Sequence, residues 1–188
     1  MERKDNNLAQ FSFFRYPISN TRPVKNITLV DAYNYIISDT AKQRTQQLRS
    51  LGDAKQRRKF KADNFDYCTF SGTFEYRKDK ALIQHSNLLC VDFDHLANLG
   101  EFCSKLLRDE YFDTQLLFLS PSGDGLKWII NINISKAPHR DYFRAITNYI
   151  SYTYGVTIDQ SGKDISRACF LPCDPNCFIN QNRINHGK

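Results

Sequence analysis

The sequence has no hydrophobic run that could cross a membrane. Its apolar stretches fall well short of the roughly eighteen residues that a membrane span requires. The first residues are polar and lack the apolar core of a signal peptide. We therefore expect a cytoplasmic protein without membrane contact. The G-x-S-x-G, Walker A and H-E-x-x-H motifs are also absent, and none of the four histidines lies in an obvious nucleophile or zinc pattern.

What the sequence does contain is enough apolar material for one folded domain. Of the 188 residues, 41% are hydrophobic and 13% are aromatic, so a substantial core can form. Six cysteines are expected to be reduced in the cytoplasm. Cys169, Cys173 and Cys177 form a C-x3-C-x3-C series, for which only the distant His186 offers a fourth zinc ligand. Inert thiols are the favoured interpretation, with a structural zinc as the alternative.

The pattern of apolar and polar residues predicts an α+β fold, with helices packed against a sheet. Thr28 is the expected N-cap of the first helix, and Gly155 is expected to end the last one. We expect helices at residues 28–38, 40–51, 54–61, 97–110 and 141–154. We expect strands at residues 11–16, 67–76, 88–94, 115–120, 127–134, 156–159 and 167–171, with 88–94 at the centre. We treat residues 1–188 as one domain, with a helical basic subregion at 1–64, a core at 65–180 and a tail at 181–188.

Two aspartates one residue apart end the central strand, Leu88-Leu-Cys-Val-Asp-Phe-Asp94. Alternate side chains of a strand share a face, so Asp92 and Asp94 should point the same way. Like charges this close are costly unless a cation lies between them. Carboxylate oxygens suit Mg²⁺ and Mn²⁺, so the pair predicts a divalent metal site. The alternative is a pair of strand-end caps in a structural protein.

A glycine-bearing hairpin, Ser120-Pro-Ser-Gly-Asp-Gly-Leu-Lys127, follows in the sequence. Its glycines allow unusual backbone angles and expose N–H groups that can hold a phosphate. Lys127 opens the next strand and is expected to reach over the turn toward an anion. The candidate nucleotide ligands here are Ser120, Ser122, Gly123, Gly125 and Lys127. A plain hairpin with a surface lysine is the alternative.

Asp159 is a third carboxylate at the end of a short apolar segment, and it could complete the metal site. The alternative is an aspartate that starts the turn formed by the following Gln-Ser-Gly. Arg167 enters an apolar strand, where its guanidinium needs a partner. Asp159, Asp164 or a triphosphate could serve.

Positive charge gathers in one segment of the chain. The net charge is +6, and residues 42–61 contain eight basic residues and one acidic residue, a local balance of +7. This segment is either a solvated helix surface or a contact for the backbone of DNA or RNA. The candidate nucleic-acid ligands in it are Arg49, Lys55, Arg57, Arg58, Lys59 and Lys61.

Taken in order, these pieces resemble the archaeo-eukaryotic primase, or prim–pol, superfamily. More closely, the chain is similar to the VirE N-terminal domain family of bacterial mobile elements. The phrases that carry the resemblance lie within residues 65–180: Ser71-Gly-Thr-Phe74, Leu89-Cys-Val-Asp-Phe-Asp94 and Asp164-Ile-Ser-Arg167. The resemblance implies an RRM-like catalytic sheet beside a smaller N-terminal α/β unit. It also implies a metal-dependent nucleotidyltransferase of primase or polymerase type, acting in the replication of a mobile element.

The same resemblance assigns roles to individual residues. Asp92, Asp94 and Asp159 would hold two Mg²⁺ or Mn²⁺ ions, and Arg167 would support the triphosphate or the template. The expected partners are a DNA template, nucleoside triphosphates, and a helicase or other replication protein. Lys127 stands where the family has a histidine, which motivates a second hypothesis of an inactive binding module. A metal-dependent nuclease is the third hypothesis, since paired acids serve hydrolysis equally well.

Overall fold

The computed structural model describes residues 9–184 and shows a mixed α+β fold, as the sequence predicts, with strands arranged in antiparallel sheets. The first sheet has the order β2-β1-β3-β9 and consists of Lys25–Ile27, Phe11–Phe14, Tyr67–Thr69 and Cys169–Phe170. The second has the order β10-β7-β8-β6 and consists of Phe178–Ile179, Thr114–Leu119, Leu126–Asn131 and Leu88–Phe93. β4 (Gly72–Phe74) and β5 (Leu82–His85) form a separate hairpin.

Six α-helices are found among the described residues: α1 (Leu29–Ile37), α2 (Lys42–Ser50), α3 (Ala54–Asn64), α4 (Leu99–Leu107), α5 (His139–Tyr154) and α6 (Gln181–Ile184). Three short 3₁₀ turns accompany them: η1 (Asp39–Ala41), η2 (Asp79–Ala81) and η3 (Gln160–Lys163). The predicted helix start is confirmed, because Thr28 and Asp31 form a reciprocal capping box at α1. The predicted end of α5 is also confirmed, at the left-handed Gly155. No helix in the described part is long and apolar enough to cross a bilayer.

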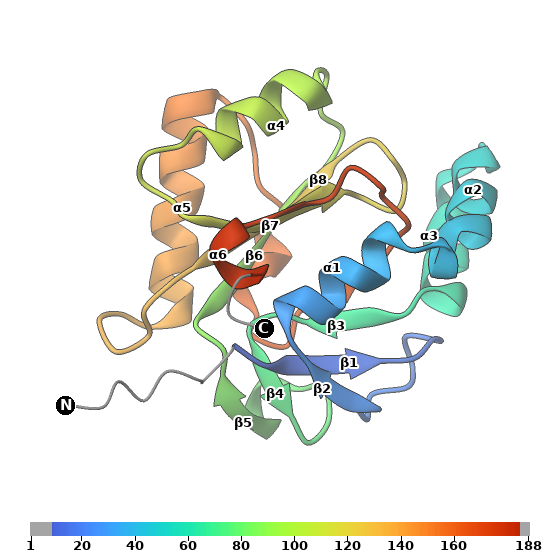
Figure 1. Cartoon of the computed structure of the whole chain (residues 1–188), viewed down its shortest axis with the longest axis horizontal. Helices are drawn as coiled ribbons and strands as arrows, with labels where there is room; N and C mark the ends of the chain where they lie inside the picture. Colours follow the sequence, from blue (N-terminus) through green and yellow to red (C-terminus); the bar gives the residue numbers. More distant parts are fainter. Residues whose placement is uncertain (1–8, 185–188) are drawn as a thin grey trace.

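The second sheet is buried on both faces. One face packs with α1 and the first sheet, through buried residues such as Ile36, Phe118 and Ile129. The other face is covered by α4 and α5, which contribute Phe102 and Ile146 among others. Figure 1 shows α1 between the two sheets, with α2 and α3 at one side of the molecule. The acidic end of β6 and the start of β8, which carries Lys127, are therefore held by a core on each side.

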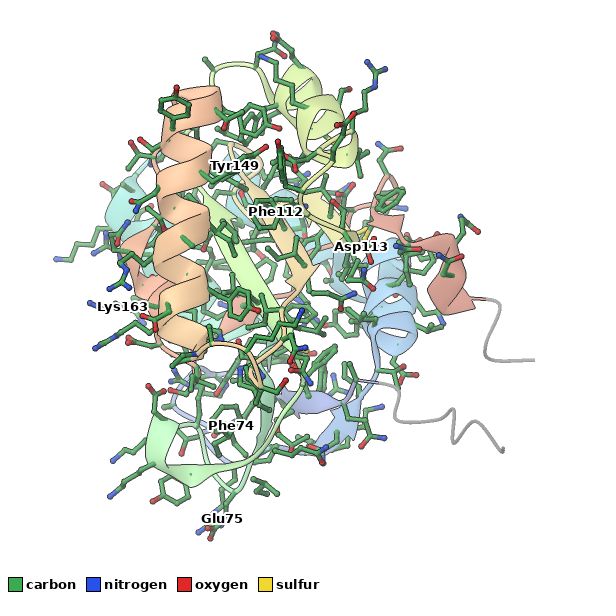
Figure 2. The ribbon with its side chains drawn as sticks, turned by 90° about the vertical axis from the view of Figure 1, so that its left-hand side faces the viewer. Phe74, Glu75, Phe112, Asp113, Tyr149 and Lys163 are labelled. Carbon is green, nitrogen blue, oxygen red and sulfur yellow. The ribbon has the colours of Figure 1, made fainter. Side chains whose placement is uncertain are left out.

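Aromatic contacts fix α5 against the second sheet. The ring centroids of Phe112 and Tyr149 are 5.1 Å apart, and Figure 2 shows these two side chains between α5 and the strands behind it. The hydroxyl of Tyr149 donates to Asp109 over 2.9 Å, and that of Tyr154 donates to the same carboxylate over 2.6 Å. These contacts make α5 a firm support for the chain that follows it, which carries Asp159.

Three strand predictions need correction. β6 lies at the end of its sheet rather than at the centre. Residues 156–159 do not form a strand: they run beside β6, where the Asp159 N–H donates to the Asp92 carbonyl over 3.2 Å. This single hydrogen bond covers the free edge of β6, but it does not make residues 156–159 a paired strand. The predicted strand 67–76 divides into β3 and β4, which belong to different sheets.

Candidate functional site

Three carboxylates that are distant in sequence meet at one point of the fold. Asp92 lies near the end of β6, Asp94 follows the strand, and Asp159 caps η3. One carboxylate oxygen from each lies within 4.8 Å of the others. The meeting point is determined by the end of β6 and by the hydrogen bond from the Asp159 N–H to the Asp92 carbonyl. The structure therefore brings together all three residues that the sequence proposes as metal ligands.

Asp92 is the buried member of this acidic cluster and is 7% exposed. Its Oδ2 forms an ion pair with the Nζ of Lys127, the residue directly opposite it in the β6–β8 ladder. Within the described residues, no group donates a hydrogen bond to its buried Oδ1. A buried carboxylate oxygen without a donor is costly unless something positive binds it. This oxygen is a candidate ligand atom for a cation.

The other two carboxylates differ in their electrostatic surroundings. Burial alone would raise the pKa of Asp159, but hydrogen bonds from Ser161 and the charge of Arg167 lower it overall. The Arg167 guanidinium lies 2.7 Å from Asp159 Oδ2, and the Ser161 hydroxyl lies 2.6 Å from the same oxygen. Partial burial, followed by the nearby charge of Asp92, raises the pKa of Asp94. Asp94 is thus the carboxylate whose charge is least compensated by its neighbours.

A cavity of about 280 Å³ is lined by Asp92 and Asp94 and has four cationic side chains in its walls. These are Lys61 from α3, Arg77 from the segment after β4, Lys127 from β8 and Arg167. Burial lowers the pKa of Lys61, and the charge of Lys127 lowers it further. Burial opposes the charge of Lys127 as well, but the adjacent Asp92 raises its pKa overall. A site that carries both signs of charge suits a metal-bound polyanion.

The position of Lys127 differs from the sequence prediction. We expected its side chain to reach over the hairpin turn toward an anion. Instead, Lys127 is 9% exposed and is bound to Asp92. The reason is that both faces of the second sheet are covered, so the face of β8 that carries Lys127 is also interior. Any anion that contacts Lys127 must share it with Asp92.

The glycine-bearing turn lies beside the acids but does not line the cavity. Ser120, Ser122, Gly123 and Gly125 are all missing from the cavity wall. A Cβ at Gly125 would lie 2.0 Å from the carbonyl oxygen of Phe93, so this glycine lets the turn approach the end of β6. Arg49 donates to the carbonyls of Ser120 and Pro121 over 3.3 and 3.2 Å. The turn therefore positions the chain around Asp94, and its phosphate contacts stay a prediction.

The basic residues predicted to contact nucleic acid do not form one free surface. Arg49 is bound to the turn, and Arg57 donates to the Leu51 carbonyl over 2.6 Å. Lys59 pairs with Asp63 at 2.5 Å, and Lys61 lines the acidic cavity. The two remaining members of the set, Lys55 and Arg58, are exposed on α3.

Sequence reasoning missed Arg77, and no local signal could have identified it. It lies in the charged stretch Glu75-Tyr-Arg-Lys-Asp-Lys80, which has no strand or helix periodicity. Its place in the cavity wall depends on long-range contacts, because its N–H donates to the Thr21 carbonyl over 2.8 Å. Its guanidinium also lies 5.3 Å from the centre of the Tyr67 ring. Only the folded chain brings these segments together.

The cysteines give no second metal site in the part of the chain that the structure describes. All six are free thiols, and the acidic cluster is the only group with metal-ligand spacing found between residues 9 and 184. Cys169 lies opposite Cys68 in the β3–β9 ladder, whereas Cys173 and Cys177 are buried beyond the strand. His186, the suggested fourth zinc ligand, lies outside the described residues.

One protein family matches the chain. The family is described as BT4734-like, N-terminal domain, and its model matches residues 59–178, which is more than half of the chain. The matched region includes the whole acidic cluster together with Lys61, Arg77, Lys127 and Arg167. No curated protein and no solved structure gives a significant match.

This match corrects the family inferred from the ordered motifs. The family found is a different one from the prim–pol superfamily and its VirE N-terminal branch, so that resemblance was wrong. Each motif that carried it is short and has a common local cause, such as an aspartate at a strand end or a glycine in a tight turn. Motifs of this kind recur on unrelated folds. The RRM-like sheet and the setting in a mobile element followed from the resemblance alone, and they have no other support.

Proposed function

We propose that this chain, which belongs to the BT4734-like N-terminal domain family, is a metal-dependent nucleotidyltransferase that extends nucleic acid during DNA replication. The observation that carries the proposal is the acidic cavity. Asp92 and Asp94 line a cavity of about 280 Å³ together with four cationic side chains, and Asp159 brings a third carboxylate oxygen within 4.8 Å of theirs. Two of the cations, Lys127 and Arg167, pair directly with these acids. Phosphoryl chemistry depends mainly on positioning and charge neutralisation, and this cavity supplies groups for both.

The residues of the cluster fit Mg²⁺ or Mn²⁺. All three candidate ligands, Asp92, Asp94 and Asp159, offer carboxylate oxygens, the donor type that these cations prefer. The buried Oδ1 of Asp92 has no hydrogen-bond donor among the described residues, so it can accept a metal without losing a bond. When bound, such cations would lower the pKa of an attacking hydroxyl and neutralise charge on the leaving phosphates.

The charge of the cavity supports the requirement for metal. Lys61, Arg77, Lys127 and Arg167 give four positive charges. Asp92, Asp94 and Asp164 of the wall, together with Asp159, give four negative charges, so the residues alone are balanced. A triphosphate is then attracted only weakly until divalent cations add positive charge. With them present, Lys61, Arg77 and Arg167 would orient the phosphates, and the acids would hold the cations.

A primer-extension assay tests the proposal. The purified chain is incubated with a labelled primer on a DNA template, nucleoside triphosphates, and Mg²⁺ or Mn²⁺. We expect a longer primer, and we expect Asp94→Asn to abolish extension while the far-ultraviolet circular dichroism stays unchanged. Lys105→Ala, on the exposed face of α4, is the control and should extend normally. Absence of extension with either metal contradicts the proposal, and shortening of the primer would indicate a nuclease.

One observation favours a second function, that of a nucleic-acid-binding module without catalysis. Lys127 forms an ion pair with Oδ2 of Asp92, so the protein itself already neutralises the charge of one candidate metal ligand. In this case the chain would bind nucleic acid, or a partner such as a helicase, through its basic residues. Binding that depends on salt but not on metal, without primer extension, would support this function.

A further inference from the structure

A second hollow lies next to the acidic cavity, on the other side of one short piece of chain. This piece belongs to the loop between β1 and β2, residues 15–24. Ile18 lines the acidic cavity, whereas residues 19–22 line an open hollow of about 400 Å³ together with Arg15 and Val24. A ligand that leaves the acidic cavity across this wall therefore enters the second hollow.

The loop is held in place by hydrogen bonds to three separate elements. The Ile18 N–H donates to the Ala62 carbonyl of α3 over 2.7 Å. The Thr21 carbonyl accepts from the Arg77 N–H over 2.8 Å, and the Asn20 carbonyl accepts from the Tyr67 hydroxyl over 2.7 Å. The loop is thus already fixed in its conformation, so a ligand need not order it when it binds.

The side chains along this loop combine positive charge with an exposed aromatic ring. Arg22 is exposed, and no ion-pair or hydrogen-bond partner for it is found in the described part of the chain. Arg15 contacts Asp66, yet its side chain stays 58% exposed. Tyr16 is 44% exposed, and the guanidinium of Arg44 lies 5.4 Å from the centre of its ring. Aromatic rings beside arginines are typical of surfaces that bind single-stranded nucleic acid, because bases stack on the ring while the cations contact phosphates.

From these observations we infer that the loop 15–24 carries a single strand of nucleic acid to and from the acidic cavity. The inference depends on the proposed function for what happens in the cavity, but not for the binding itself. It places the strand on a surface outside the basic segment 42–61, where Arg49 and Arg57 donate hydrogen bonds to backbone carbonyls of the protein. An acidic peptide would match the charge of the loop but would gain nothing from the ring of Tyr16.

The test measures strand binding without metal or nucleotide. A fluorescein-labelled oligothymidylate of about twelve nucleotides is titrated with the full chain in EDTA, and binding is followed by anisotropy. We expect Tyr16→Ala to weaken binding by about tenfold or more, as loss of one stacked base does, and Tyr16→Phe to retain it. We expect Arg22→Ala to weaken binding and to lower the slope of log affinity against log salt by about 0.7, the value for one phosphate contact.

The control is Arg108→Ala, which removes another exposed arginine, at the end of α4, far from the loop in Figure 1. It should bind like the wild type. Wild-type affinity for both Arg22→Ala and Tyr16→Ala would overturn the inference, and so would losses confined to Lys55→Ala and Arg58→Ala. Equal competition by polyglutamate would also overturn it, in favour of an acidic peptide. Because neither metal nor nucleotide is present, these results are independent of whether primer extension succeeds.

Discussion

Replacement of Lys127 by methionine removes the cation from the buried ion pair while it keeps most of the side-chain length. In the wild type, Lys127 contacts Oδ2 of Asp92, and both side chains are about nine-tenths buried. The variant leaves a buried carboxylate whose Oδ1 already lacks a donor in the described structure. The nearest remaining cation in the described structure is Arg167, with a guanidinium nitrogen 3.7 Å from Oδ2.

The expected size of the effect follows from these contacts. Loss of one partner from a buried ion pair typically costs about 3–5 kcal/mol in unfolding free energy. Arg167 compensates part of the charge on Asp92, so we expect a value near the lower end, about 3 kcal/mol. For a chain of this length, that corresponds to a fall in Tm of about 10 °C in EDTA. A divalent cation should reverse much of this loss, because it restores positive charge beside Asp92.

Urea unfolding of the wild type and of Lys127→Met, each with EDTA and with Mn²⁺, measures both effects. Since Lys127 competes with a metal for Asp92, we expect Mn²⁺ to stabilise the variant more than the wild type. The double variant Lys127→Met/Asp92→Asn is the control, because it removes both charges and should gain little from Mn²⁺. A loss below about 1 kcal/mol in EDTA, or equal stabilisation of all three proteins by Mn²⁺, would refute the reasoning.

Three further predictions concern other parts of the structure. His85 contacts His139 at 3.1 Å, and burial lowers the pKa of His85 to about 4. The unfolded chain therefore binds more protons between pH 6.5 and 4, and stability should fall by up to about 3 kcal/mol as pH decreases through this range. The fall should be smaller in His85→Gln, in which burial still lowers the pKa of His139. A flat profile of unfolding free energy in the wild type would count against this. Gly125→Ala places a Cβ 2.0 Å from the Phe93 carbonyl, so we expect a lower Tm and weaker Mn²⁺ binding, whereas an unchanged Tm would show that the turn can move. Asp66 is fully buried and forms ion pairs with the half-exposed Arg15 and the mostly buried Arg44. Asp66→Asn should cost about 3 kcal/mol in urea unfolding, a result that a loss below about 1 kcal/mol would contradict.

The parts of the structure that could be predicted from the sequence depend on local patterns. The capping box of Thr28 and Asp31 and the helix end at Gly155 follow from residues within one turn of each other. The meeting of Asp92 with Asp94 follows from strand periodicity. Asp159 could be proposed as a third metal ligand because it ends an apolar segment. The hydrogen bond from its N–H to the Asp92 carbonyl could not be predicted.

The parts that could not be predicted depend on contacts between distant segments. The burial of Lys127 follows from the covering of both faces of the second sheet, which no single strand pattern encodes. Arg77 reaches the cavity through its contact with the loop at Thr21, which lies far earlier in the chain. The wrong family inference has the same origin, because short motifs were compared without the long-range contacts that define a fold.

The central claim is that the cluster of Asp92, Asp94 and Asp159 binds divalent cations. Titration of the purified chain with Mn²⁺, with the free ion followed by electron paramagnetic resonance, tests it directly. We predict saturable binding by the wild type that is strongly weakened in Asp94→Asn and in Asp159→Asn, and unchanged in the control Asp63→Asn on α3. No saturable binding, or equal binding by all four proteins, would contradict the claim.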